Sequence, residues 1–251
     1  MIAGALGRAA SAAGVAVLGY LAYVAVRGSR ALVWPAVRPL VPEPPDAPSN
    51  PGDLGFEYDA IRIRTDDGGE LAAWFIPAAQ PTDTAVVVMH GYSGHRLPEL
   101  AGFVPWLRER HNVLQFDFRG HGESDAGPVT MGARARRDVG AAVAALRARG
   151  LTRIALFGVS MGAAAAILAA PDLPVAAVVA DAPYARTAHP IANRMRGEGW
   201  PLPGPGSTAI VLGASLRARA VLPDPIDAVG RMGRRALLVI VSDADRLISW
   251  R

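Results

Sequence analysis

Short apolar runs separated by helical patterns dominate the chain from residue 84 onward. The runs predict strands that are buried on both faces of a sheet, at 84–89, 112–118, 152–159, 175–180 and 236–241. Helical periodicity lies between them, at 97–110, 131–149 and 161–170. Because strands alternate with helices at this spacing, the pattern predicts an α/β domain with right-handed crossovers and a mostly parallel sheet.

A different pattern precedes this alternation. Apolar and polar side chains alternate over 56–65, a turn follows at 66–69, and 70–77 again has the pattern of a strand. Two such segments joined by a tight turn predict an antiparallel hairpin. Near the other end, the segment 184–222 interrupts the alternation and is rich in proline and glycine around 200–206. An insertion between two sheet strands predicts a cap over a functional site.

The N-terminal pattern is an uncharged apolar run from Ala9 to Val26, bounded by Arg8 and Arg27. With its flanks it approaches the roughly 20 residues that cross a bilayer. A cleaved signal peptide and a buried helix are the alternatives. No small-residue cleavage site follows the run, because Arg27 and Arg30 interrupt it, so a single-pass anchor is favoured.

Flanking residues give the anchor an expected orientation. Tyr20 and Tyr23 suit an interfacial belt, and the arginines after the run outnumber the one before it. The positive-inside rule then places the following domain in the cytoplasm. Proline recurs from Trp34 to Pro51, which predicts an extended spacer holding the domain off the membrane. The expected organisation is an anchor at 1–30, a linker at 31–52 and a domain at 53–251.

Composition narrows the function classes. The chain has 251 residues and a net charge of +4, and its basic side chains are all arginine. This modest, dispersed charge gives little support for nucleic acid binding, and we expect none. Cysteine is absent, which excludes disulfides, thiolate metal sites and a cysteine nucleophile.

The candidate chemistry centres on Gly158-Val-Ser160-Met-Gly162, between an apolar strand and an alanine-rich helix. A serine at such a sharp turn is held in a strained conformation that pushes its hydroxyl out of the sheet. Small residues two before and two after it let strand and helix approach closely. An ordinary glycine-rich turn is the alternative interpretation.

The order of motifs resembles the α/β-hydrolase fold, and more narrowly its membrane-anchored Bem46-like and serine aminopeptidase-like branch. Four segments from Phe56 onward carry the resemblance, which are His90-Gly91, Asp117-Phe-Arg-Gly-His-Gly-Glu-Ser124, Gly158-x-Ser160-x-Gly162, and Asp224-Pro-Ile-Asp-Ala-Val before a strand that ends in Ser242-Asp-Ala-Asp245. The resemblance implies an α/β-hydrolase fold with a cap insertion at about 184–222, and with its last strand and helix missing.

The resemblance also implies roles. Ser160 would be the nucleophile, the backbone N–H groups of Tyr92 and Met161 would form the oxyanion hole, and Asp245 would be the acid, with Asp243 as its alternative because Ser242 replaces the usual glycine. His90, Gly91, Gly158 and Gly162 would shape the site. No metal or organic cofactor is implied.

The family's catalytic histidine follows the acid, and no histidine follows Asp245 in this chain. His90 and His121 are expected to be structural, while His189 in the cap is a possible substitute. The missing histidine leaves two interpretations, which are a fragment of a longer hydrolase and a pseudoenzyme that keeps the pocket. The intact acid motif favours the fragment.

The functional hypothesis is therefore a membrane-anchored serine hydrolase, of esterase, lipase or peptidase type. It would cleave an ester, thioester or amide of a small-molecule or lipid-like acyl substrate through an acyl-enzyme on Ser160. A membrane-bound pseudohydrolase or binding protein is the alternative hypothesis. The oligomeric state and the exact substrate are not predicted.

Overall fold

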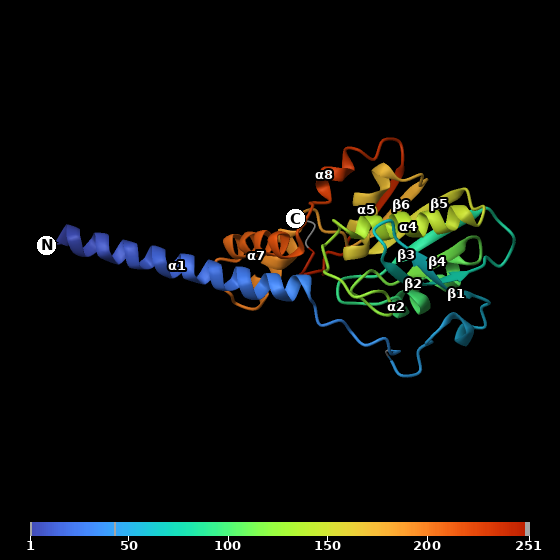
Figure 1. Cartoon of the computed structure of the whole chain (residues 1–251), viewed down its shortest axis with the longest axis horizontal. Coiled ribbons are helices and arrows are strands. Elements are labelled where there is room, and N and C mark those ends of the chain that lie inside the picture. Colours follow the sequence, from blue (N-terminus) through green and yellow to red (C-terminus); the bar gives the residue numbers. More distant parts are fainter. Residues whose placement is uncertain (1, 43, 249–251) are drawn as a thin grey trace.

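A computed structural model describes residues 2–42 and 44–248, and a single sheet forms the centre of that part (Figure 1). Its seven strands have the order β1-β2-β4-β3-β5-β6-β7. Their bounds are β1 Asp59–Arg64, β2 Glu70–Ile76, β3 Thr84–Met89, β4 Asn112–Phe116, β5 Arg153–Val159, β6 Ala177–Asp181 and β7 Ala236–Ile240. From β4 to β7 every neighbouring pair is parallel. The predicted α/β-hydrolase fold with a mostly parallel sheet is confirmed.

The predicted hairpin is also confirmed. Strands β1 and β2 pair antiparallel, with Asp59 opposite Phe75 and Arg64 opposite Glu70. Strand β2 then pairs antiparallel with β4, so the hairpin extends the sheet at one edge. Residues of β2 are buried on both faces, because helices cover both sides of the sheet there.

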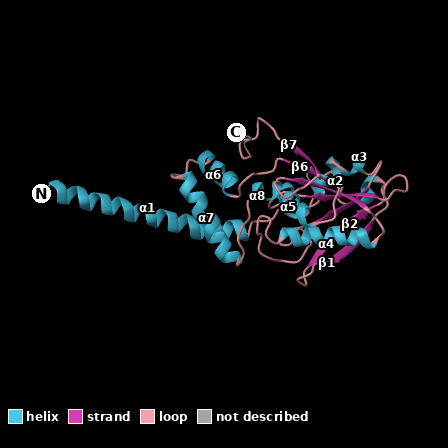
Figure 2. Ribbon diagram, turned by 90° about the horizontal axis from the view of Figure 1, so that it is seen from above, coloured by secondary structure: helices cyan, strands magenta, loops and turns pink. Residues whose placement is uncertain are grey.

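Helices cover the two faces of the sheet (Figure 2). One face packs against α4 (Ala135–Ala148) and α5 (Met161–Ala169) in the larger apolar cluster. The other face packs against α2 (Leu97–Gly102) and α3 (Val104–Leu107) in the smaller one. The short helix α8 (Ile226–Val229) and the 3-10 turns Pro51–Leu54 and Ala170–Asp172 complete this part. Burial on both faces is what a sheet of continuous apolar runs requires.

One predicted helix is divided. The pattern predicts a helix over 97–110, whereas the structure has α2 and α3 separated at Phe103. Pro105 has no backbone N–H for the carbonyl of Ala101, and its ring opposes a continuous helix at that carbonyl. The prolines at 98 and 105 each stand at the start of one short helix, where a missing N–H has no cost.

The N-terminal helix α1 (Ile2–Val33) packs beside α7 (Pro203–Ala218), as Figure 1 shows, and α7 packs in turn against α6 (Ala188–Gly197), the other helix of the insertion. Glycine permits the close approach, since a Cβ on Gly28 would lie 2.6 Å from Ile210 Cδ1 and one on Gly213 would lie 2.9 Å from Ala25 O. Ala10–Val33 is long and apolar enough to cross a membrane, a test that a signal sequence also passes. The long apolar helix that the sequence predicts is therefore present.

The proline-rich segment lies against the domain, and the prediction that it holds the domain off the membrane stays a prediction. Val33, the last residue of α1, is fully buried, and its carbonyl accepts a hydrogen bond from Val129 N at 2.9 Å. The segment then runs over the domain, where Arg38 N donates to Ser93 O at 3.0 Å and Leu40 packs against the smaller apolar cluster. The end of α1 is thus part of the domain surface, because its apolar side chains find partners there.

Candidate active site

Ser160 stands at the turn between β5 and α5. Its backbone has φ 52° and ψ −109°, a conformation that costs free energy for any residue other than glycine. Hydrogen bonds on both sides hold this turn, because Ser160 N donates to Asp181 O at 2.8 Å and Ala164 N donates to Ser160 O at 3.0 Å. The strained conformation favours the nucleophile-elbow interpretation over an ordinary turn.

The two glycines of the motif are required by packing. A Cβ added to Gly158 would lie 2.3 Å from the carbonyl carbon of Gly162. A Cβ added to Gly162 would lie 2.5 Å from Met89 O, on the neighbouring strand β3. Both clashes are with backbone atoms, which cannot rotate away. The spacing that the sequence predicts therefore matches contacts among β5, α5 and β3.

Two backbone N–H groups flank the serine. The Gly91 position faces Ser160, since an added Cβ there would lie 3.6 Å from Ser160 Cβ. Tyr92 follows directly, and Met161 opens helix α5. In the described part of the chain neither the Tyr92 nor the Met161 amide donates a hydrogen bond. Free donors beside the serine, one of them at a helix N-terminus, can stabilise a developing oxyanion.

His90 is held in the core beneath this loop. Phe118 N donates to His90 Nε2 at 3.1 Å, so Nδ1 carries the ring proton and donates to Gly91 O at 2.8 Å. Burial is the main cause that lowers the pKa of His90 to about 4, with the neighbouring His121 also acting in that direction. Both nitrogens are engaged, so this ring has no lone pair left for the proton of Ser160.

His121 has a similar arrangement. Ser93 N donates to His121 Nε2 at 3.2 Å, and His121 Nδ1 lies 3.2 Å from Arg119 O. Burial lowers the pKa of His121. These contacts tie the loop after β4 to the loop after β3, and the structural roles expected for both histidines stay predictions.

A buried carboxylate organises the loop after β4. Asp117 is fully buried and pairs with the Arg96 guanidinium, while Glu123 N donates to Asp117 Oδ2 at 2.9 Å. Gly122 has φ 49°, and a Cβ there would collide with the Asp117 carboxylate. The motif's glycine and aspartate are thus explained by one contact.

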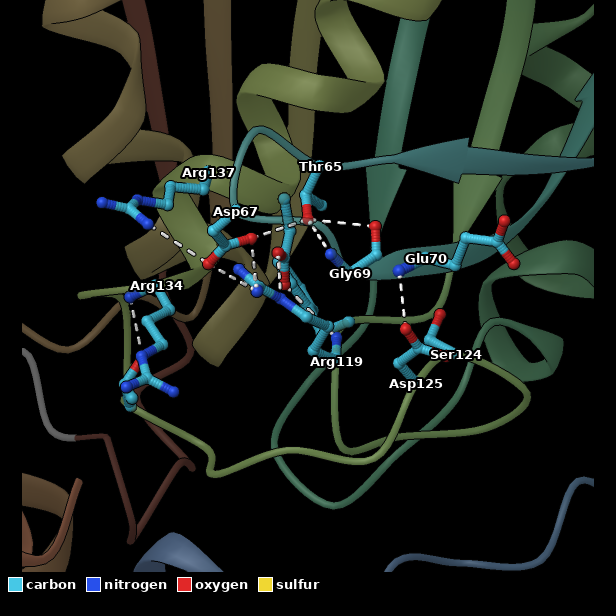
Figure 3. A network of polar contacts seen from close by, with 12 residues as sticks. Thr65, Asp67, Gly69, Glu70, Arg119, Ser124, Asp125, Arg134 and Arg137 are labelled. Atoms are coloured by element: carbon cyan, nitrogen blue, oxygen red, sulfur yellow. Dashed lines mark hydrogen bonds and ion pairs between the residues drawn. The ribbon is translucent and has the colours of Figure 1, made fainter.

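A second network holds the same loop from outside (Figure 3). The Arg119 guanidinium lies between two carboxylates, 2.7 Å from Asp67 Oδ1 and 2.7 Å from Asp138 Oδ1. The hydrogen bond from Arg119 is the main cause that holds the pKa of Asp67 well below its usual range. Burial is the main cause that raises the pKa of Asp138 to about 6. Glu70 N donates to Asp125 Oδ2 at 2.8 Å. These bonds join the hairpin turn to α4 and hold the loop after β4 in place.

The predicted acid lies in the loop after β7. Asp245 Oδ1 accepts hydrogen bonds from Leu247 N and Ile248 N, both at 2.8 Å, so its described partners are amides of its own loop. Asp243, the alternative acid, is exposed. Leu247 and Ile248 line the same cavity as Ser160, which brings the Asp245 loop to the site.

His189 does not line that cavity. It is exposed at the beginning of α6, whereas the next two residues, Pro190 and Ile191, face the cavity. Its substitution for the missing histidine stays a prediction that these contacts do not support. No group of three or more His, Cys, Asp or Glu residues suited to a metal ion occurs among the residues that the structure describes.

The cavity at Ser160 has a volume of about 750 Å³ and a mostly apolar wall. Buried residues of the domain form its inner end, including Tyr184, whose hydroxyl donates to Met131 O at 3.3 Å. The sequence did not indicate that α1 contributes to the wall, yet Arg27, Ala31 and Leu32 face the cavity. A membrane span, a signal peptide and a buried helix each account for the apolar run, and none of them points to a part in a site.

Comparison with known proteins places this site in a family. The model of the family described as serine aminopeptidase, S33, matches residues 80–210. YfhR of Escherichia coli K12 is 30% identical over 207 residues, which are 78% of this chain and 66% of YfhR. YqkD of Bacillus subtilis is 28% identical over 225 residues, covering 75% of this chain and 71% of YqkD.

Solved structures agree. The esterase PF2001 of Pyrococcus furiosus has a TM-score of 0.68 at 28% identity, over 80% of this chain and 76% of the esterase. The α/β hydrolase GrgF of a Penicillium species has a TM-score of 0.58 at 21% identity, over 76% of this chain and 82% of GrgF, and shows the fold alone. The matched family model covers more than half of the chain, from β3 to β6 with the Ser160 turn, and the chain belongs to the serine aminopeptidase S33 family of α/β hydrolases.

Proposed function

We propose that this hydrolase cleaves a carboxylic ester through an acyl-enzyme on Ser160, with thioesters and amides as chemically related substrates. The observation that carries the proposal is the strained Ser160 turn, which opens into an apolar cavity between two free backbone N–H groups. The likeness to an esterase at 28% identity supports an ester over an amide.

The proposed reaction has two stages. Ser160 Oγ attacks the carbonyl carbon, and the N–H groups of Tyr92 and Met161 hold the oxyanion. The C–O bond to the alcohol then breaks, the proton lost by Ser160 passes to the departing alcohol, and the acyl group stays on Ser160. Water attacks the acyl carbon, its hydroxyl leaves with the acid, and its other proton returns to Ser160 Oγ. Asp245 is the proposed acid that orients the base, with Asp243 as its alternative.

Removal of the Ser160 proton by a base determines how fast the acyl-enzyme is expected to form. A base must take the proton of Ser160, since a serine hydroxyl is a weak nucleophile when protonated. In the described residues no histidine lines the cavity. Loss of one triad member leaves residual catalysis that is slower by about ten-thousandfold or more. A slow formation of the acyl-enzyme is therefore expected for this chain.

Helix α1 is the proposed membrane anchor, with the domain on the cytoplasmic side. Its apolar composition and length support the span. Arg27, Arg30 and Arg38 after the run, against Arg8 before it, support this orientation.

Labelling with a fluorophosphonate probe tests the nucleophile, because the phosphorus reacts with an activated serine. The full chain in detergent is expected to be labelled slowly, and Ser160→Ala should abolish the label. Ser49→Ala is the matched control, since Ser49 lies in the linker and hydrogen-bonds Asp53. An unlabelled wild-type chain would overturn catalysis by this chain and favour the second candidate, a binding protein that keeps the cavity without the base.

A further inference from the structure

The cavity wall and the apolar helix share residues, which connects the site to a membrane. Tyr23, Arg27, Ala31 and Leu32 of α1 line the cavity that contains Ser160. Tyr92, whose amide is a proposed oxyanion donor, donates its hydroxyl to Ala31 O at 2.9 Å. Helix α1 therefore belongs to the site as well as to the apolar run.

Two hydrogen bonds show at which level along α1 the cap helices lie. The Tyr20 hydroxyl donates to Pro201 O at 2.5 Å, in the turn between α6 and α7. Farther along both helices, Arg217 Nε donates to Ser29 Oγ at 3.2 Å. Thus α7 runs parallel to the stretch from Tyr20 to Ser29, and the turn before it lies beside the uncharged run that ends at Val26.

Arg27 marks the expected membrane surface. It is the first charged residue after the apolar run, and charged side chains stay at or outside the hydrocarbon boundary. Tyr20 precedes Val26 by six residues, so the turn that it contacts lies about 9 Å deeper, the depth to which interfacial segments insert. Trp200 and Leu202 in that turn are 39% and 41% exposed, as side chains that enter a bilayer interface would be.

We infer that the substrate is a membrane lipid ester, whose acyl chain enters the cavity from the bilayer between α1 and the cap helices. This inference rests on the proposed function and names its substrate class. Arg27 lines the cavity at the level of the surface, Arg194 and Glu198 add charged groups to its wall, and the rest of the wall that it shares with Ser160 is mostly apolar. An acyl chain can therefore leave the hydrocarbon and reach the serine without crossing water.

Photo-crosslinking in vesicles tests this route without catalysis. The full chain is reconstituted in phosphatidylcholine vesicles that contain phosphatidylcholine with a diazirine at the end of one acyl chain. Trypsin cleaves after arginine, which gives the peptides 9–27 and 154–186. The first carries label from surrounding lipid, and the second contains both Ser160 and Tyr184, so label on it reports an acyl chain inside the cavity.

The expected result is label on both peptides of the wild-type chain. Ala31→Trp, which fills the cavity from α1, should lower the label on 154–186 about tenfold or more and leave that on 9–27. Ala31→Leu should lower it less. Ala22→Trp is the matched control, because Ala22 is an exposed α1 residue that does not line the cavity.

Two outcomes separate this inference from the proposed function. Ser160→Ala should keep the internal label, so a labelled cavity without fluorophosphonate reactivity would overturn catalysis and leave the lipid route standing. Label confined to 9–27 in the wild-type chain, or equal internal label in Ala31→Trp and Ala22→Trp, would overturn the lipid route even if Ser160 reacts.

Discussion

Strands β5 and β7 belong to the same parallel sheet, and each leads into a loop with a proposed catalytic residue, but their surroundings differ. Strand β5 lies between β3 and β6, and every residue of the following helix α5 is buried. Strand β7 pairs with β6, and no other described strand pairs with it. Its apolar residues Leu238 and Val239 are 56% and 46% exposed.

The difference shows that a strand is buried by the strands and helices that pack against it, and that an apolar sequence alone does not bury it. Both strands are continuous apolar runs, yet covering elements enclose only β5. The Ser160 turn is consequently fixed by backbone contacts with other elements, such as that between Gly162 and Met89. Asp245 is held by two amides of its own loop. Of the two loops, the one with the proposed nucleophile has more contacts to other elements of the fold.

Among the changes that leave a folded chain, the largest loss of stability is expected when the Ser160 turn is broken. Gly162→Ala places a Cβ 2.5 Å from Met89 O, and because backbone must move, the free energy of unfolding should fall by about 3 kcal/mol or more. Gly204→Ala in α7 is the matched control, since no atom lies within 4 Å of its added Cβ. Urea denaturation in detergent measures both, and equal midpoints for the two variants would contradict the packing argument.

A second change in stability, which depends on pH, tests whether water reaches the face of the sheet that α2 covers. Glu99 in α2 is 7% exposed, and burial is the main cause that raises its pKa to about 7. The folded pKa lies above the unfolded one, so the wild-type chain loses stability as pH rises from about 4.5 to about 7. Glu99→Gln cannot ionise and should be more stable by about 3 kcal/mol at pH 8, with no gain at pH 4.

Denaturation curves at a series of pH values check this prediction. The stability difference between Glu99→Gln and the wild-type chain should grow with pH across that window and then level off. If the stabilities of the two proteins depend on pH in the same way, the Glu99 carboxyl is hydrated in the folded state. Water would then reach this face of the sheet more easily than the burial of Glu99 indicates.

The smallest effect on stability is expected at β7. Leu238→Lys should change the free energy of unfolding by no more than about 0.5 kcal/mol, because the side chain is already exposed. A charge on this edge should reduce pairing with other chains, which light scattering in detergent would detect as smaller particles. Phe157 is the matched position, in the same register two strands away and 4% exposed, and Phe157→Lys should prevent folding.

Local patterns determined much of the fold in advance. The hairpin, the buried strands and the Ser160 turn all follow from short-range features, namely period-two alternation, apolar runs and glycine spacing. The helix break at Phe103 is also encoded locally, by Pro105, although the periodicity alone predicts a continuous helix. The position of His90 in the loop after a strand could be predicted, whereas Asp117 was expected inside the strand 112–118 and instead follows the end of β4 at Phe116. Their partners Arg96 and Phe118 N could not be predicted.

By itself the sequence determined the order of elements, the strained serine turn and the apolar helix, because each depends on residues that are near one another in the chain. Only the tertiary structure decided that this helix forms a wall of the cavity and that, among the residues it describes, β6 alone pairs with β7. The Tyr20 to Pro201 contact joins residues 181 positions apart. Such contacts depend on how whole surfaces fit together. Gly28 and Gly213 permit the close approach of the helices, but a glycine in the sequence does not show which surface will approach it.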